Sequence, residues 1–211
     1  MELITINKNE MRQNVYVYFC PETKEGVIID PGHHFDEVKK SVNENEIKIA
    51  NVLLTHGHYD HILHAKEAAD YFDAKIYCHL EEKEMLETPE LNLSTHVSRT
   101  LVCFAPDVLL REGDNVPVGK SNLAVIHTPG HTPGSLCFYD ETNARLFSGD
   151  TLFFESIGRT DFPKSSTKAI IKNVKEKLFT LPPKVAVYPG HGISTTVGYE
   201  VANNEIIAWY V

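Results

Sequence analysis

The segment Thr55-His56-Gly57-His58-Tyr59-Asp60-His61 places four side chains that can bind a metal ion within six residues. It directly follows the short apolar segment 51–55, which predicts a buried strand, and it precedes a predicted helix. A turn between a strand and a helix can direct several such side chains toward one cavity. Imidazole nitrogen and carboxylate oxygen suit zinc, iron or manganese, whereas calcium and magnesium prefer oxygen ligands alone. The alternative is a solvated polar loop, which explains this density of ligands poorly.

Three later segments share one pattern, in which a short predicted strand ends beside glycine and a ligand-type residue. They are His127-Thr-Pro-Gly-His131, Phe147-Ser-Gly-Asp150 and Tyr188-Pro-Gly-His191. Glycine lets the backbone turn sharply, so that the neighbouring side chain can stand at the rim of a sheet. Together with the first motif they provide seven ligands: His56, His58, Asp60, His61, His131, Asp150 and His191. Seven ligands suit two metal ions that share one carboxylate and keep the open coordination that catalysis needs.

Hydrophobic periodicity and turn residues predict strands and helices along the whole chain. Predicted strands cover 2–6, 15–20, 26–30, 51–55, 75–78, 108–110, 123–127, 135–139, 145–147 and 185–188. Predicted helices cover 35–44, 62–72, 81–86, 165–179 and 197–209, and residues 88–105 predict a long surface connection. No linker or repeat interrupts the series, which indicates one domain over 1–211. Two similar halves with outer helices suggest two sheets packed face to face between helical layers, an α/β or α+β layered fold.

The composition argues against several classes of protein. With 42% hydrophobic and 23% charged residues, the chain resembles an ordinary globular domain. The net charge of −9 and the lack of a Lys/Arg cluster argue against nucleic-acid binding. We see no signal peptide and no apolar run of membrane-spanning length, so we expect no membrane association and a cytoplasmic location. The four scattered cysteines, at positions 20, 78, 103 and 137, are expected to remain reduced.

The order of these motifs resembles the metallo-β-lactamase superfamily over residues 27–192. The resemblance implies a four-layer αββα sandwich with the metals at one edge, between the sheets. It further implies that the ligands divide into two groups around two divalent ions. The first ion would be held by His56, His58 and His131, and the second by Asp60, His61 and His191. Asp150 would bridge the two ions, and Asp30, in Ile-Ile-Asp-Pro-Gly, would support the ligands from behind.

Two further features place the chain within the superfamily by resemblance. True β-lactamases of this fold generally lack a histidine at the position of His61 and often use a cysteine ligand, so β-lactam hydrolysis is disfavoured. The segment Gly158-Arg-Thr-Asp-Phe162 resembles the short, single-domain glyoxalase II-like (hydroxyacylglutathione hydrolase-like) branch, and also the persulfide dioxygenases. The residues expected to line the cleft are Phe153, Ile157, Arg159 and Phe162. Arg159 could bind a substrate carboxylate or brace its loop through Asp161, and bracing is favoured because Arg–Asp pairs close in sequence usually organise a loop.

The implied reaction is hydrolysis of a small-molecule thioester such as S-lactoylglutathione. Two divalent ions, zinc foremost with iron or manganese as alternatives, would lower the pKa of a shared water so that hydroxide attacks the carbonyl. Asp60 would orient this nucleophile. The open alternatives are a mononuclear-iron persulfide dioxygenase, a lactonase and a non-catalytic metal-binding protein.

Two departures from full-length glyoxalase II leave the thiol undefined. The final helix has no Lys or Arg over 200–207, and Gly192-Ile-Ser follows His191 where glyoxalase II typically places a tyrosine. The other histidines, at positions 33, 34, 64, 79 and 96, are expected at the surface or at helix caps, and His127 could support a ligand.

Overall fold

The first half of the chain forms a mixed sheet in the computed structural model, which describes residues 1–7, 13–97 and 100–209. Six strands follow one another in chain order: β1 (Glu2–Ile6), β2 (Val15–Phe19), β3 (Glu25–Ile29), β4 (Lys48–Leu53), β5 (Lys75–His79) and β6 (Val108–Leu110). β1 to β3 pair antiparallel, and β3 to β6 pair parallel. Both faces of this sheet are covered, and every residue of β2 is buried. This explains why its strands appear in the sequence as continuous apolar runs.

The second half forms another six-stranded sheet. Its spatial order is β14 (Thr195–Thr196), β13 (Ala186–Pro189), β10 (Arg145–Gly149), β9 (Leu136–Asp140), β8 (Ser121–His127) and β7 (Asn115–Val118). β10 and β13 are parallel, and the other neighbours are antiparallel. A short hairpin of β11 (Leu152–Phe153) and β12 (Ser156–Ile157) follows β10.

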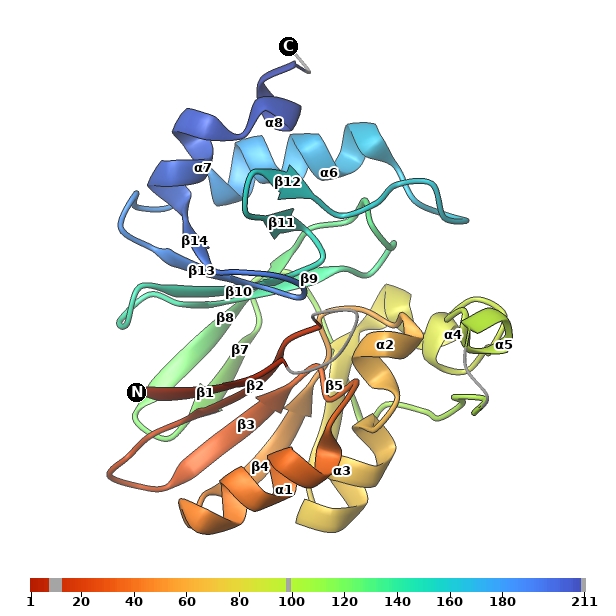
Figure 1. Cartoon of the computed structure of the whole chain (residues 1–211), viewed down its shortest axis with the longest axis vertical. Helices are drawn as coiled ribbons and strands as arrows, with labels where there is room; N and C mark the ends of the chain where they lie inside the picture. The colour runs from red at the N-terminus through yellow and green to blue at the C-terminus, as the bar shows by residue number, and fades with distance from the viewer. Residues whose placement is uncertain (8–12, 98–99, 210–211) are drawn as a thin grey trace.

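Helices cover the outer face of each sheet (Figure 1). On the first sheet lie α1 (Phe35–Glu44) and α3 (Ala65–Phe72), whose apolar residues share a core with Val15 and Ile28. On the second lie α6 (Thr167–Asn173), the π-helical turn η2 (Val174–Leu178), α7 (Val197–Asn203) and α8 (Glu205–Trp209). Beside the first sheet lie α2 (Tyr59–Ile62), η1 (Leu80–Glu82), α4 (Lys83–Leu86) and α5 (Ser94–Val97). The predicted four-layer αββα sandwich is therefore confirmed.

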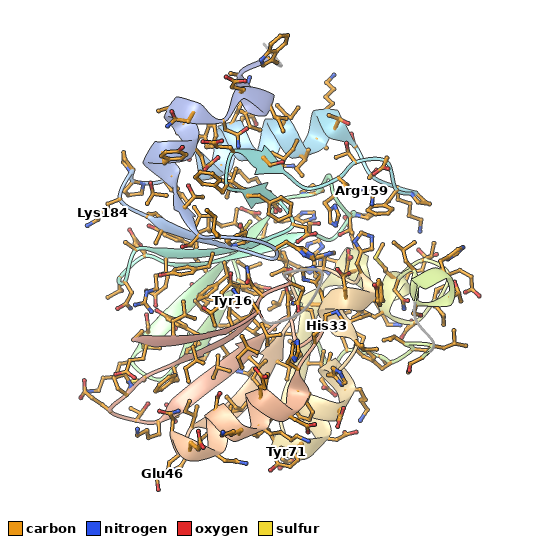
Figure 2. All side chains as sticks on the ribbon, in the orientation of Figure 1. Tyr16, His33, Glu46, Tyr71, Arg159 and Lys184 are labelled. Carbon is orange, nitrogen blue, oxygen red and sulfur yellow. The ribbon has the colours of Figure 1, made fainter. Side chains whose placement is uncertain are left out.

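A third core, between the two sheets, fixes their separation. Tyr16 of β2, labelled in Figure 2, lies in it with Tyr18 and Phe147. The Phe147 ring lies 5.3 Å from the ring of Tyr16 and 5.2 Å from that of Tyr18, between centroids. The Tyr16 hydroxyl donates to Pro189 O at 2.6 Å, and the Tyr18 hydroxyl donates to Asp140 Oδ2 at 2.7 Å. Each buried phenol thus satisfies its polar atom on the opposite sheet.

The structure differs from the sequence prediction in its short elements. β7, β14 and the β11–β12 hairpin were not predicted, and two predicted helices, 62–72 and 197–209, are interrupted. Asn204 explains the second break, because its Oδ1 accepts from Ile207 N and caps α8. The connection 88–105 contains α5, and residues 98–99 of it lie outside the described part.

The four cysteines are unpaired in the structure, as expected. Cys20, Cys78 and Cys137 are buried, Cys103 is exposed, and all four are free thiols. Among the described residues, no helix is both long enough and apolar enough to cross a bilayer.

We expect Phe147→Ala to lower the free energy of unfolding by about 3–5 kcal/mol, because it empties a fully buried site that joins the two sheets. Leu101→Ala is the control, since Leu101 is 65% exposed and its loss should change stability by less than about 0.5 kcal/mol. Denaturant unfolding followed by circular dichroism measures both. Equal effects for the two variants would contradict the assignment of the core between the sheets.

Candidate metal centre

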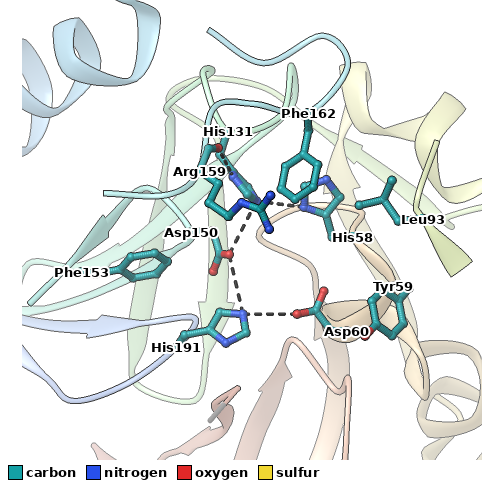
Figure 3. A pocket seen from close by; sticks show the side chains of 10 residues that line it. All are labelled: His58, Tyr59, Asp60, Leu93, His131, Asp150, Phe153, Arg159, Phe162 and His191. Carbon is teal, nitrogen blue, oxygen red and sulfur yellow. Dashed lines mark hydrogen bonds and ion pairs between the residues drawn. The ribbon is translucent and has the colours of Figure 1, made fainter. Parts of the chain in front are cut away.

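The seven predicted ligands meet at one edge of the sandwich, where loops from both sheets converge. Figure 3 shows His58, Asp60, His131, Asp150 and His191 among them. His56 and His58 lie in the turn after β4, and α2 carries Asp60 and His61 in its single turn. The remaining three follow strands of the second sheet: His131 after β8, Asp150 after β10 and His191 after β13. Glycine-containing turns and α2 thus place the seven predicted ligands at the same sheet edge.

His56, His58 and His131 form one cluster, called here the first site. Their ligand atoms lie within 4.8 Å of one another, and all three side chains are buried. His58 Nδ1 lies 2.9 Å from His131 Nε2. The rings of His56 and His131 are tilted edge to face, with centroids 4.8 Å apart. Three imidazoles from two loops therefore turn their nitrogens toward one point.

Asp60, His61 and His191 form a second cluster, called here the second site. His61 Nε2 lies 3.1 Å from His191 Nε2, and His191 Nε2 lies 3.3 Å from Asp60 Oδ2. His61 is fully buried, whereas His191 is partly exposed. The second site is therefore more acidic and closer to solvent than the first.

Asp150 lies between the two sites. Its Oδ2 is 3.5 Å from His131 Nε2 and 3.7 Å from His191 Nε2, while its Oδ1 is 3.4 Å from His61 Nε2. One carboxylate thus approaches ligand nitrogens of both sites. This is the position that a bridging ligand requires.

The arrangement of these nitrogen and oxygen atoms suits metal binding better than hydrogen bonding among the side chains. Within the described residues, His56 Nε2 and Asp150 Oδ1 are buried without a hydrogen-bond partner, which is costly unless another group binds them. Two imidazole nitrogens on one tetrahedral zinc ion, each at about 2.0–2.1 Å, would be about 3.3 Å apart. The nitrogen pairs His58–His131 and His61–His191, at 2.9 Å and 3.1 Å, are close to this spacing.

Groups behind the ligands fix the orientation of their rings. His61 Nδ1 lies 2.9 Å from Asp30 Oδ2, and His131 Nδ1 donates to Arg159 O at 2.7 Å. Asp30 is itself held by Thr55, whose backbone N and Oγ1 donate to its two oxygens at 2.7 Å and 2.6 Å. Such contacts select the ring tautomer and leave the other nitrogen for a metal. Asp30 therefore lies where the sequence predicts, behind His61.

The loop that carries His191 is held by Asn14, which directly precedes β2 and is far from His191 in sequence. Asn14 N donates to Gly190 O at 2.8 Å, and Asn14 Nδ2 donates to Pro189 O at 2.9 Å. Gly190 permits the close approach, because a Cβ there would lie 2.2 Å from Asp150 Oδ1. Asn14, near the start of the chain, thereby positions the loop of His191, the last of the predicted ligands.

The electrostatics differ between the two sites. Burial lowers the pKa of His56 far below its usual value and that of His58 to about 3, so these imidazoles are neutral and ready to bind metal. Burial also lowers the pKa of His61, but Asp150, Asp60 and the hydrogen bond with Asp30 outweigh it and raise this pKa to about 10. The carboxylates around His61 therefore favour its charged form, whereas burial favours the neutral forms of His56 and His58.

A cavity of about 350 Å³ opens onto the centre (Figure 3). Ligand side chains form its floor, and its walls include Tyr59, Leu93, Phe153, Arg159 and Phe162. Three of the four predicted cleft residues are among them. The fourth, Ile157, packs against the core under α6 instead and is not among the described residues that line the cavity. The sequence does not predict Tyr59 and Leu93 as cavity residues. Leu93 belongs to the connection 88–105, which shows no periodicity.

Arg159 is engaged with its own loop. Its Nε and Nη2 donate to the two carboxylate oxygens of Asp161 at 3.0 Å and 2.7 Å, and its guanidinium lies 4.5 Å from the Phe162 ring centre. The Phe162 ring in turn lies 4.9 Å from the ring of His58. The bracing role predicted for Arg159 matches this geometry, which holds Phe162 over the first site.

A second histidine pair lies outside the centre. His79 stacks on His127 with ring centroids 3.8 Å apart, and Glu81 lies near them. His79 Nδ1 accepts from Glu81 N as a helix cap, and His127 Nε2 donates to Pro133 O at 2.8 Å. The two rings are nearly parallel, so their remaining nitrogens do not point toward a common metal position. The expected role of His79 as a helix cap therefore describes this pair better than a metal site does.

We expect Asp30→Asn to weaken metal binding about 10–100-fold, because the amide no longer provides a charged acceptor for His61. Competition between the protein and a chromophoric chelator measures the affinity. Asp36→Asn is the control, since Asp36 pairs with Lys39 on the exposed face of α1. Unchanged affinity in Asp30→Asn would show that Asp30 does not act on the ligands.

Comparison with known proteins agrees with this geometry. The family model of the metallo-β-lactamase superfamily matches residues 9–191. Hydroxyacylglutathione hydrolase GloC of Haemophilus influenzae is 31% identical over 209 residues, which cover 98% of both chains. Probable metallo-hydrolase YqgX of Bacillus subtilis is 34% identical over 191 residues, which cover 90% of both.

Solved structures show the same architecture. The crystal structure of BLEG-1 B3 metallo-β-lactamase has a TM-score of 0.92 at 34% identity and covers 98% of this chain and 99% of its own. TTHA1623 in a di-iron-bound form has a TM-score of 0.83 at 32% identity, with 97% and 98% covered. ETHE1 from Myxococcus xanthus has a TM-score of 0.82 at 27% identity, with 100% and 86% covered. With the layered fold and the ligand set in place, these matches show that the chain belongs to the metallo-β-lactamase superfamily.

Proposed function

We propose that the chain is a dinuclear metallo-hydrolase that cleaves a small-molecule thioester, S-lactoylglutathione or a related thiol ester. The observation that carries the proposal is the position of Asp150, whose carboxylate approaches ligands of both sites. The ions we expect are two divalent metals, zinc foremost, with iron or manganese as alternatives. The di-iron form of TTHA1623 supports a two-metal centre in a protein 32% identical to this one. We place the reaction in the cytoplasm, where the four free thiols would persist.

The protein side chains would divide the work as follows. The seven candidate ligands would hold the metal ions, which when bound would lower the pKa of a water molecule and act as a Lewis acid toward the carbonyl oxygen. Asp60 borders the cavity, where its carboxylate can accept a hydrogen bond from the attacking water and orient it. Among the described residues that line the cavity there is no serine or cysteine, so no side-chain nucleophile of that kind is at hand.

The cavity wall supports a thiol ester with apolar parts. Tyr59, Leu93, Phe153 and Phe162 surround the ligands, and Arg159 is the cation among the residues described there. The identity with GloC over nearly the whole chain supports a hydroxyacyl thioester. Because Arg159 is already paired with Asp161, and because Gly192-Ile193-Ser194 follows His191, we extend the proposal to thiols other than glutathione and to lactones.

We expect chelation to abolish thioester hydrolysis and added Zn²⁺, Fe²⁺ or Mn²⁺ to restore it. Asp150→Ala should lower kcat/KM more than about 100-fold, since loss of groups merely behind the ligands costs about 10–100-fold. The same substitution should also lower the metal content below the two ions per chain expected for the wild type. The measurements are kcat/KM for S-lactoylglutathione and elemental analysis of the same samples.

Asp70→Ala is the matched control, because Asp70 is an exposed carboxylate on α3 that pairs with Lys66. Its metal content and activity should equal those of the wild type. Full thioesterase activity in a metal-free sample, or in Asp150→Ala, would refute the proposed reaction.

The role of Arg159 can be measured by a double-mutant cycle with Asp161. If Arg159 braces the loop through Asp161, then Arg159→Ala and Asp161→Ala should lower kcat/KM by similar factors, and the double variant should lose little more. If Arg159 instead binds a substrate carboxylate, only Arg159→Ala should raise KM, and the effect should disappear with an uncharged thioester. We expect the first result, because the bidentate pair is formed in the structure.

Two alternatives have distinct signatures. The B3 metallo-β-lactamase BLEG-1, at 34% identity, weakens the expectation that β-lactam hydrolysis is disfavoured, so this activity is the second candidate. A β-lactam beside thioesters and lactones in one substrate panel decides between them. The persulfide dioxygenase alternative requires one iron per chain and oxygen uptake, whereas the seven ligands favour two ions.

A further inference from the structure

Glu82 is a fully buried carboxylate close to the metal centre that belongs to neither site. It ends the short helical turn η1 after β5, and its exposed fraction is 0%. It is not among the described residues that line the cavity. In the sequence it lies in Glu81-Glu82-Lys83-Glu84, and such a charged run is typical of a solvated helix face. Its burial therefore calls for a specific reason, because burying a charge is costly unless it is hydrogen-bonded.

The carboxylate of Glu82 joins the two loops that carry the first site. Its Oε1 accepts from Gly57 N at 2.7 Å, between His56 and His58 in sequence. Its Oε2 accepts from Thr132 Oγ1 at 3.0 Å and from Gly134 N at 2.8 Å. Thr132 directly follows His131 in sequence. One side chain thus holds a loop from each sheet on its two oxygen atoms.

The surroundings are built for an acceptor at this point. A Cβ on Gly134 would lie 2.5 Å from Glu82 Oε2, so glycine leaves room for the carboxylate. The Thr132 and Ser135 hydroxyls lie 2.8 Å apart, and Ser135 Oγ accepts from Thr132 N at 3.0 Å, which closes the loop on itself. Three donors therefore converge on Glu82, and no ion pair joins it to a cation within the described chain.

We propose that Glu82 is a positioning residue for the first metal site, which sets the separation of His58 and His131 by tying their loops together. The proposal rests on the metal centre and not on any particular substrate. Glutamine cannot replace Glu82 without loss. Both oxygens of Glu82 accept hydrogen bonds, and the amide NH₂ of glutamine, which can only donate, would stand where one of these acceptors is needed. The loops would move apart, and the first site would lose affinity.

The test measures the two sites separately with Zn²⁺ or Co²⁺ titrations of the metal-free full chain. His191→Ala disables the second site and reports on the first, whereas His56→Ala reports on the second. Glu82→Gln should weaken binding about 10–100-fold in the His191→Ala background and leave it unchanged in the His56→Ala background. Burial raises the pKa of Glu82 to about 7, so titrations at pH 8 compare the ionised carboxylate with the amide.

The neighbouring Glu81→Gln is the matched control, because the Glu81 side chain is exposed on the same turn. If Glu82→Gln fails to fold, Thr132→Val removes one of the three donors and should weaken the first site alone, while Thr132→Ser, which keeps the hydroxyl, should restore it. Equal weakening of both sites, or a lower melting temperature of the metal-free protein with unchanged first-site affinity, would overturn the proposal and leave Glu82 a general structural role. A failed substrate panel with normal metal binding would refute only the proposed reaction.

Discussion

The packing of the two sheets against each other is the constraint on which the metal centre depends. Neither sheet carries a complete site, because His56 and His58 follow β4 in the first sheet whereas His131 follows β8 in the second. The core around Tyr16, Tyr18 and Phe147 sets the distance between the sheets. Because close-packed interiors resist small displacements, this core keeps the loops at the sandwich edge in fixed positions relative to one another. Hydrogen bonds across the edge, such as Asn14 to Pro189, then fix the loops themselves.

The charge distribution in the centre explains why the sites are unlike. The first site consists of three buried imidazoles whose pKa values burial lowers, and the Phe162 ring lies against that of His58. The second contains His61 among three carboxylates, and those carboxylates would repel one another without a cation. The second site therefore favours positive charge at this point, and a bound metal ion would supply it.

The structure brings the seven candidate ligands together at one edge of the sandwich. They can be found in the sequence because most of them lie in turns after apolar strands, while Asp60 and His61 lie on α2 just after such a turn. The sequence predicts β2, β3 and β9 most clearly, because nearly all of their residues are buried and form almost continuous apolar runs. Short elements such as β14 lack any such run, since two residues contain no periodicity. Ile157 was assigned to the cleft from the neighbouring motif, but its side chain turns to the core beneath α6. Glu82 could not be predicted, because its burial depends on donors 25 and 52 residues away in the chain.

The division of the ligands between the halves has a consequence for biosynthesis. As the chain is made, the first sheet emerges with four ligands in place but with the face that bears Tyr16 and Tyr18 still uncovered. Such a half-made chain would expose apolar surface until β8 to β13 cover it, and exposed apolar surface favours aggregation. An ion captured early by His56 and His58 would lack His131, so it would be held loosely and could exchange. The seven candidate ligands would therefore be complete only when the sandwich closes and the last turn, at His191, is in place.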